Sequence, residues 1–140
     1  MTAHSDSLPN KNPNAAYPAK PKDSSSLIIL KKGKLGVQVL MGKRGRKAVF
    51  SNAYVFAGGK VDPGDSLPKP ASELNPDIAR RISSDTAKAK SFAMAAVREA
   101  YEETGFLLGA SGDLGETGNE SWDEIRSMNL APNLEKMHYV

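Results

Sequence analysis

One stretch constrains the fold more than any other: Arg98-Glu-Ala-Tyr-Glu-Glu-Thr-Gly105, which ends a predicted helix that begins near Ser91. At about 100° per residue, Glu102 lies about 60° from Glu99 on one side, and Glu103 about 40° from it on the other. Apolar side chains gather on the opposite side of this helix: Ala93, Met94, Val97, Ala100 and Tyr101. The pattern therefore predicts a helix with one buried face and one acidic face.

The acidic face is electrostatically unfavourable by itself. Like charges three or four residues apart each cost roughly 0.2–0.5 kcal/mol, and carboxylates in the last turn also meet the negative end of the helix dipole. A bound divalent cation would reverse the sign of both effects. A second interpretation is a solvated face on which Arg98 pairs with Glu102 across one helical turn. The charge pattern alone leaves both interpretations open.

The length and the residue types exclude several kinds of protein. The chain of 140 residues is long enough for one domain with its own core, but not for two. No run approaches the ~18 apolar residues of a membrane span, so we expect no membrane partner. Cysteine is absent, which excludes disulfides, thiolate metal ligands and a cysteine nucleophile. This composition fits a reducing compartment, and we expect a cytoplasmic protein.

Charge is distributed unevenly along the chain. Residues 1–60 hold 11 Lys and Arg against 2 Asp and Glu, whereas residues 106–140 hold 2 against 6. A basic amino-terminal half is typical of a protein that binds a phosphorylated small molecule. The chain has only four Phe and four Tyr, too few for the interleaved aromatic residues of a single-stranded nucleic-acid platform. We therefore expect a phosphorylated substrate and not a nucleic acid.

The amino-terminal half is predicted to contain a tail and three strands. Residues 1 to about 23 are rich in Pro, Ser and Asn, which predicts a disordered tail. Apolar runs predict strands at 27–30, 35–41 and 53–56, the first two joined by a hairpin turn at 31–34. The basic loop 43–47 contains Lys43, Arg44 and Arg46 and is either a soluble turn or a phosphate-binding loop. Gly58 and Gly59 follow the third strand and allow a close approach to a ligand or a positive φ.

The carboxy-terminal half is predicted to be mainly helical. Residues 66–90 form an inserted loop with a short helix whose first turn holds Pro76. Ser91 is expected to cap the main helix and Gly105 to end it, while Ser121 caps a further short helix. Strands are predicted to begin at 106–108 and to cover 134–140. If Val140 is the natural end, the last strand leaves a sheet edge that must be covered or paired, so a homodimer is one expected arrangement.

Gly59, Asp65 and the run Arg98-Glu-x-x-Glu-Glu-x-Gly105-Phe106 together resemble the Nudix box, G-x5-E-x7-R-E-U-x-E-E-x-G-U, in which U is a bulky apolar residue. Five residues separate Gly59 from Asp65, as in the box, although Asp stands in place of Glu. Between Asp65 and Arg98 lie 32 residues rather than 7, which implies an insertion of 25 residues. The resemblance covers roughly residues 27–108.

The resemblance implies an α/β fold, an α/β/α sandwich around a mixed sheet that is incomplete at the carboxyl terminus. Residues 24–140 would form this domain, with the insertion at about 66–90. It also implies that Glu99, Glu102 and Glu103 bind Mg²⁺ or Mn²⁺, together with the Gly58 carbonyl. Oxygen-only ligands suit these hard cations.

The implied activity is metal-assisted hydrolysis of a pyrophosphate bond in a nucleoside diphosphate linked to another group. Arg98 would orient a carboxylate of the box, and Glu99 or Glu102 would accept the proton of the attacking water. Gly58, Gly59 and the basic loop would bind the substrate. In much of the family a base or last ligand lies beyond the box, and four glutamates are available there: Glu116, Glu120, Glu124 and Glu135.

The substrate and the activity itself each have an alternative. The stretch 53–62 and the insertion that follows are similar to the Nudix branch that includes coenzyme A diphosphatases, so coenzyme A or a derivative is a candidate substrate. Asp65 and the interrupted box also suit a Nudix-fold module that binds a nucleotide and has lost catalysis. Such a module would bind without releasing phosphate.

Overall fold

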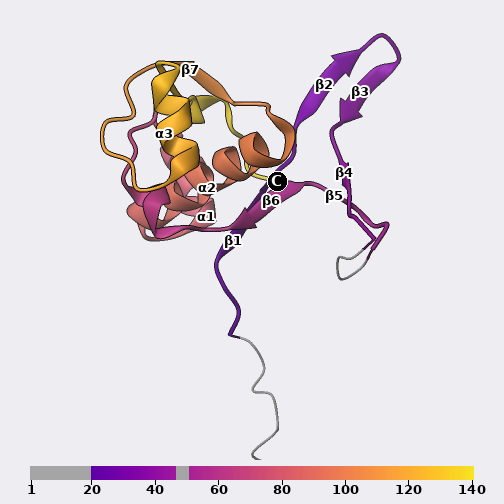
Figure 1. Ribbon diagram of the computed structural model, residues 1–140, viewed down its shortest axis with the longest axis horizontal. Helices are drawn as coiled ribbons and strands as arrows, with labels where there is room; N and C mark the ends of the chain where they lie inside the picture. The colour runs from indigo at the N-terminus through magenta and orange to yellow at the C-terminus, as the bar shows by residue number, and fades with distance from the viewer. Residues whose placement is uncertain (1–19, 47–50) are drawn as a thin grey trace, which may run out of the picture.

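The computed structural model describes residues 20–46 and 51–140 (Figure 1). Most of the predicted tail and Lys47 of the basic loop lie outside these ranges. The strands are β1 (Ser24–Leu27), β2 (Leu30–Gly33), β3 (Gly36–Val39), β4 (Gly42–Lys43), β5 (Tyr54–Val55), β6 (Ala57–Lys60), β7 (Gly109–Ser111) and β8 (Leu130–Pro132). The helices are α1 (Pro76–Ile82), α2 (Thr86–Thr104) and α3 (Glu120–Ser127), with 3-10 turns η1 (Pro63–Ser66) and η2 (Leu134–Lys136).

The central helix α2 is longer at its start than we predicted. Asp85 is its N-cap, and the Asp85 carboxylate accepts hydrogen bonds from the backbone N–H groups of the second and third helical residues. The predicted cap, Ser91, instead lies within the helix and donates to the carbonyl four residues before it. The predicted end is confirmed: Gly105 has a φ of 75°, and its N–H donates to the Tyr101 carbonyl at 2.8 Å.

The apolar side of α2 forms the centre of the core. The predicted apolar face is buried at Ala93, Met94, Val97 and Ala100, and Tyr101 is half-buried. Other elements bury large side chains against the same cluster: Leu74, Leu114, Trp122, Ile125 and Leu134. Figure 1 shows the helices gathered in one part of the molecule, with the β1–β6 ladder running beside α2. The acidic end of α2 is therefore held against both a strand and α3.

The strands pair differently from the sandwich that we expected. In the described ranges they form four two-stranded antiparallel ladders, β1–β6, β2–β3, β4–β5 and β7–β8, and not one mixed sheet. A parallel contact occurs as an isolated bridge between Ser72 and Asn133. The predicted third strand is divided at Phe56: β5 before it pairs with β4, and β6 after it pairs with β1. The observed architecture is a mixed helix-and-strand fold with small sheets.

Several other boundaries differ from the predictions. The hairpin is present, but residues 31–33 of the predicted turn belong to strand β2. The chain turns at 34–35, just before Gly36, whose φ is 120°. Residues 106–108 form no strand, because the chain leaves the left-handed Gly105 in a turn and pairs only from Gly109 onward. The predicted final strand begins instead with η2. The short helix with Pro76 in its first turn is confirmed as α1.

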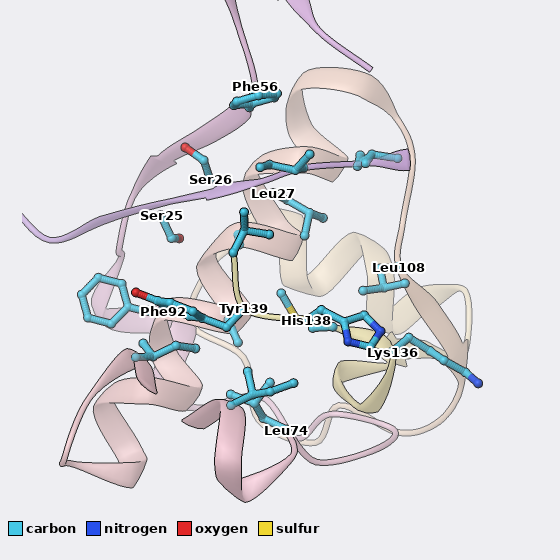
Figure 2. A pocket seen from close by; sticks show the side chains of 18 of the residues that line it. Ser25, Ser26, Leu27, Phe56, Leu74, Phe92, Leu108, Lys136, His138 and Tyr139 are labelled. Carbon is cyan, nitrogen blue, oxygen red and sulfur yellow. The ribbon is translucent and has the colours of Figure 1, made fainter. Parts of the chain in front are cut away.

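An apolar groove of about 730 Å³ lies between the β1–β2 connection, α1, α2 and the last residues (Figure 2). Leu27, Phe92 and Tyr139 are among the side chains that line it. Its apolar walls distinguish it from the acidic end of α2.

Among the described residues, no helix combines the length and apolar character that crossing a membrane requires.

Candidate active site

The acidic face of α2 lies directly on the two glycines of β6. The Gly58 N–H donates to Glu103 Oε2 at 3.3 Å, although 45 residues separate the two in sequence. A Cβ atom added at Gly59 would lie 2.4 Å from the carboxylate carbon of Glu99. Neither glycine has a positive φ, so the reason for glycine at these positions is the close approach of the α2 carboxylates and of β1.

The edge of β6 offers a further oxygen to this face. In an antiparallel strand the N–H and C=O groups of one residue point to the same side. Because the Gly58 N–H points to Glu103, the Gly58 carbonyl leaves β6 on the same side. The carboxylates of Glu99 and Glu103 therefore lie beside the edge of β6 that carries the Gly58 carbonyl, although α2 and β6 are far apart in sequence.

The buried group beneath this face is the ion pair of Arg98 with Asp65. Arg98 Nε donates to Asp65 Oδ1 at 2.7 Å, and Nη2 donates to Asp65 Oδ2 at 3.1 Å. The side chains are 5% and 0% exposed. Arg98 Nη2 also donates to the Lys60 carbonyl at 2.9 Å. The 32 residues between Asp65 and Arg98 therefore leave the two halves of the interrupted box in direct contact.

Asp65 is satisfied on all sides. It accepts from the Asp62 N–H at 2.8 Å within the capping box of η1, and from Trp122 Nε1 at 2.9 Å. Both oxygens of this buried carboxylate therefore have hydrogen-bond donors from the protein, including a two-pronged guanidinium. Asp65 thus holds Arg98 in place from below, and its shorter side chain compared with Glu fits the contact.

Arg98 bridges two carboxylates of the acidic face. Its Nη1 atom donates to Glu99 Oε1 and to Glu102 Oε1, each at 3.0 Å. Burial alone lowers the pKa of Arg98, but the hydrogen bonds to Asp65 and Glu102, together with the charges of these two groups, outweigh burial and raise the pKa above its ordinary value. The pKa of Glu99 is raised, first by burial, with Arg98 acting in the opposite direction. Arg98 therefore contacts two carboxylates of the acidic face, and the orienting role that the resemblance implies stays a prediction.

The acidic face has the oxygen ligands that a divalent cation prefers, but their side chains do not point to a common position. In the part of the chain that the structure describes, no three Asp, Glu, His or Cys side chains form a group that could hold a metal ion. Glu99 and Glu103 lie against β6, whereas Glu102 Oε1 accepts hydrogen bonds from Arg98 and from Ser121 Oγ, the latter at 2.6 Å. Hard oxygen donors still suit Mg²⁺ or Mn²⁺.

The basic loop is not beside this face. Lys43 ends β4, Arg44 and Arg46 follow it, and all three are exposed. Figure 1 shows β4 and β5 to the side of the helical part, away from α2. A different set of cations approaches the site: Lys20, Lys22 and Lys60 line an open hollow of about 360 Å³ together with Ser24 and Gly59. These lysines, and not the described residues of the basic loop, therefore adjoin Gly59.

The sequence patterns did not identify Ser121 and Trp122 as parts of the site. Ser121 was predicted to cap α3, but Asn119 is the cap, and its Oδ1 accepts from the Ser121 N–H at 2.8 Å. This leaves the Ser121 hydroxyl for Glu102. An available signal was the single Trp of the chain, because a buried indole N–H requires an acceptor. Among the glutamates beyond the box, Glu124 lies near the Tyr101 hydroxyl and raises the pKa of Tyr101.

Comparison with solved structures relates this arrangement to a known fold. The chain is similar to the NUDIX hydrolase from Alicyclobacillus acidocaldarius, with a TM-score of 0.56 and 20% identity. The similarity covers 81% of this chain and 57% of that one, so the chain spans a little over half the length of the solved protein. No family model and no curated protein matches the sequence. The structural similarity shows that the fold is of the Nudix-like α/β type.

Proposed function

We propose that this chain belongs to a metal-dependent hydrolase that cleaves a pyrophosphate bond in a nucleoside diphosphate linked to another group. One observation carries the proposal: on a Nudix-like fold, Glu99 and Glu103 lie against Gly59 and Gly58, with Arg98 bound to the Asp65 of the same interrupted box. The neighbouring protein is described as a hydrolase of this family. An ordinary solvated acidic face would not require a glycine at position 59, where an added Cβ atom would meet the Glu99 carboxylate.

Each residue of the site has a proposed task. Glu99, Glu102 and Glu103 would hold Mg²⁺ or Mn²⁺, with the Gly58 carbonyl as a further oxygen ligand. When bound, the cation supplies Lewis-acid chemistry, which offsets the charge of the diphosphate and activates water. Arg98 keeps the carboxylates of Glu99 and Glu102 oriented, and one of these two accepts the proton of the attacking water.

The substrate is proposed to approach from the side of the lysine hollow. Lys20, Lys22 and Lys60 line this hollow next to Gly59, and their charges would favour the phosphates of the substrate. Coenzyme A or a derivative is the proposed substrate, on the resemblance of the glycine stretch and its insertion to that branch. The exposed cations of the basic loop, Lys43, Arg44 and Arg46, are a second proposed phosphate contact.

The test is hydrolysis of a substrate panel by the purified chain. Coenzyme A, ADP-ribose and common nucleotides are incubated with Mg²⁺ or Mn²⁺, and product is measured by chromatography. We expect Glu103→Gln to lower kcat/KM by at least about 100-fold, because even residues outside the ligand shell change activity by 10–100-fold. Glu102→Gln should have a comparable effect. Retention of full activity by both variants would refute the proposal.

A matched control separates the site from the general effect of removing a carboxylate. Glu73 is exposed and pairs with Lys90 at 3.8 Å, so Glu73→Gln removes one acidic charge away from β6 and should leave kcat/KM unchanged. Binding of a nucleotide without hydrolysis at any Mg²⁺ or Mn²⁺ concentration would instead identify a Nudix-fold binding module.

A further inference from the structure

Two neighbouring side chains at the start of α3 reach back to the acidic site. Ser121 Oγ donates to Glu102 Oε1 at 2.6 Å, and Trp122 Nε1 donates to Asp65 Oδ1 at 2.9 Å. The same two carboxylate oxygens accept from Arg98, which donates to Asp65 through Nε and to Glu102 through Nη1. Each oxygen therefore has one donor from α2 and one from α3.

The start of α3 is firmly placed. Trp122 is fully buried and belongs to the apolar cluster around α2. Asn119 caps α3 by accepting a hydrogen bond from the Ser121 N–H at 2.8 Å. Because the cap and the buried indole fix the backbone on either side, the Ser121 hydroxyl is held in position for Glu102.

Glu102 is less restricted by burial than Glu99. Its side chain is 33% exposed, compared with 16% for Glu99, so burial restricts it less. Arg98 and Ser121 both bind Oε1 of Glu102. With Oε1 engaged by two donors, Oε2 is the oxygen that Glu102 offers to a ligand.

We infer that Ser121 is a positioning residue, which with Arg98 fixes Glu102 so that one oxygen is held and the other is presented to the cation. The inference rests on the proposed function, since the ligand of Glu102 is the divalent cation proposed there. It makes α3, which lies outside the interrupted box, a supporting part of the site.

Mn²⁺ binding tests this role without any substrate. Free Mn²⁺ is titrated with the protein and measured by electron paramagnetic resonance. Loss of the hydroxyl in Ser121→Ala should weaken Mn²⁺ affinity by about 10-fold, as expected for a residue that orients a metal ligand. Ser121→Thr keeps a hydroxyl and should restore most of the affinity. Ser127→Ala is the control, because Ser127 lies at the far end of α3 and donates to a backbone carbonyl of its own helix.

A second measurement needs no metal. Melting temperatures of metal-free Ser121→Ala, Glu102→Ala and the double variant form a cycle, in which a direct contact makes the double loss smaller than the sum of the single losses. Additive losses would overturn the positioning role, as would wild-type Mn²⁺ affinity in Ser121→Ala when Glu102→Gln has lost affinity. If wild-type protein binds no Mn²⁺, the proposed function fails, and the cycle alone decides whether Ser121 positions Glu102.

Discussion

At the scale of single residues, Gly58 and Gly59 differ in what an added methyl group would meet. At Gly58 the new Cβ would lie 2.5 Å from the Ser25 carbonyl oxygen and 2.8 Å from the Ser26 Cα atom, both of which belong to the backbone of β1. At Gly59 the three atoms nearest to the added Cβ all belong to the carboxylate end of Glu99. A side-chain end can rotate away, whereas a paired strand cannot. A substitution at Gly58 should therefore lower the stability of the fold, whereas a substitution at Gly59 should mainly affect ligand binding.

We predict that Gly58→Ala lowers the free energy of unfolding by about 1–3 kcal/mol, the usual cost of overpacking. Gly59→Ala should change it by less than about 1 kcal/mol but weaken Mn²⁺ binding, because Glu99 is displaced from β6. Denaturant unfolding and Mn²⁺ titration measure the two effects. Gly45→Ala is the control for stability, since nothing lies within 4 Å of its added Cβ. Equal unfolding free energies for Gly58→Ala and Gly59→Ala would contradict this assignment.

At the scale of elements, the start of α2 distinguishes two capping residues that the sequence offers. Asp85 accepts two backbone hydrogen bonds at the helix start, while Ser91 sits one and a half turns inside. We predict that Asp85→Ala lowers the free energy of unfolding by about 1 kcal/mol. Ser91→Ala should leave the free energy of unfolding nearly unchanged, because the Ser91 hydroxyl donates to a backbone carbonyl within its own helix. Thermal and denaturant unfolding of both variants measure these free energies. If Ser91 were the cap, Ser91→Ala would be the more destabilising of the two.

The features that the sequence predicted correctly depend on residues close together in the chain. The end of α2 follows from a glycine that accepts a left-handed φ, and the buried side of α2 follows from the helical period. Spacing also placed Glu99, Glu102 and Glu103 on one face. The box pattern assigned Arg98 and Asp65 to one motif, but their ion pair was not predicted. Their metal-binding and catalytic roles stay predictions.

Contacts between distant segments could not be predicted in this way. The bonds from α3 join residues 19 and 57 positions apart, which no local period encodes. The splitting of the third strand depends on which partner each half finds, β4 or β1. Lys20, Lys22 and Lys60 meet beside Gly59 for the same reason: β1 pairs with β6 and carries the preceding lysines with it.

At the scale of the whole molecule, the long connection between Asp65 and Arg98 has little effect on closing the site. Each doubling of a flexible loop adds only about 0.6 kcal/mol to the entropy cost of closure. Part of the connection is also structured: α1 packs on α2 through Ala79, and Ile78 and Ile82 are half-buried at the same cluster. The insertion therefore adds core contacts while it preserves the ion pair.

The bonds of Arg98 also affect how the molecule opens and closes. Its guanidinium joins the end of β6 through Lys60, the η1 turn through Asp65 and two further residues of α2, and Trp122 ties α3 to the same aspartate. Detaching any one segment leaves a buried charge short of partners, which is strongly unfavourable. These segments should therefore open together as one cooperative unit.

Native-state hydrogen exchange can detect this unit. We predict that slowly exchanging amides near the end of α2, in β6 and at the start of α3 share one opening free energy and one denaturant dependence. The β2–β3 hairpin, whose residues are mostly exposed and which projects from the helical part (Figure 1), should exchange faster and independently. Separate opening free energies for α3 and the end of α2 would argue against a shared unit. If the unit exists, fluctuations that disassemble the acidic site are as rare as unfolding of the core itself.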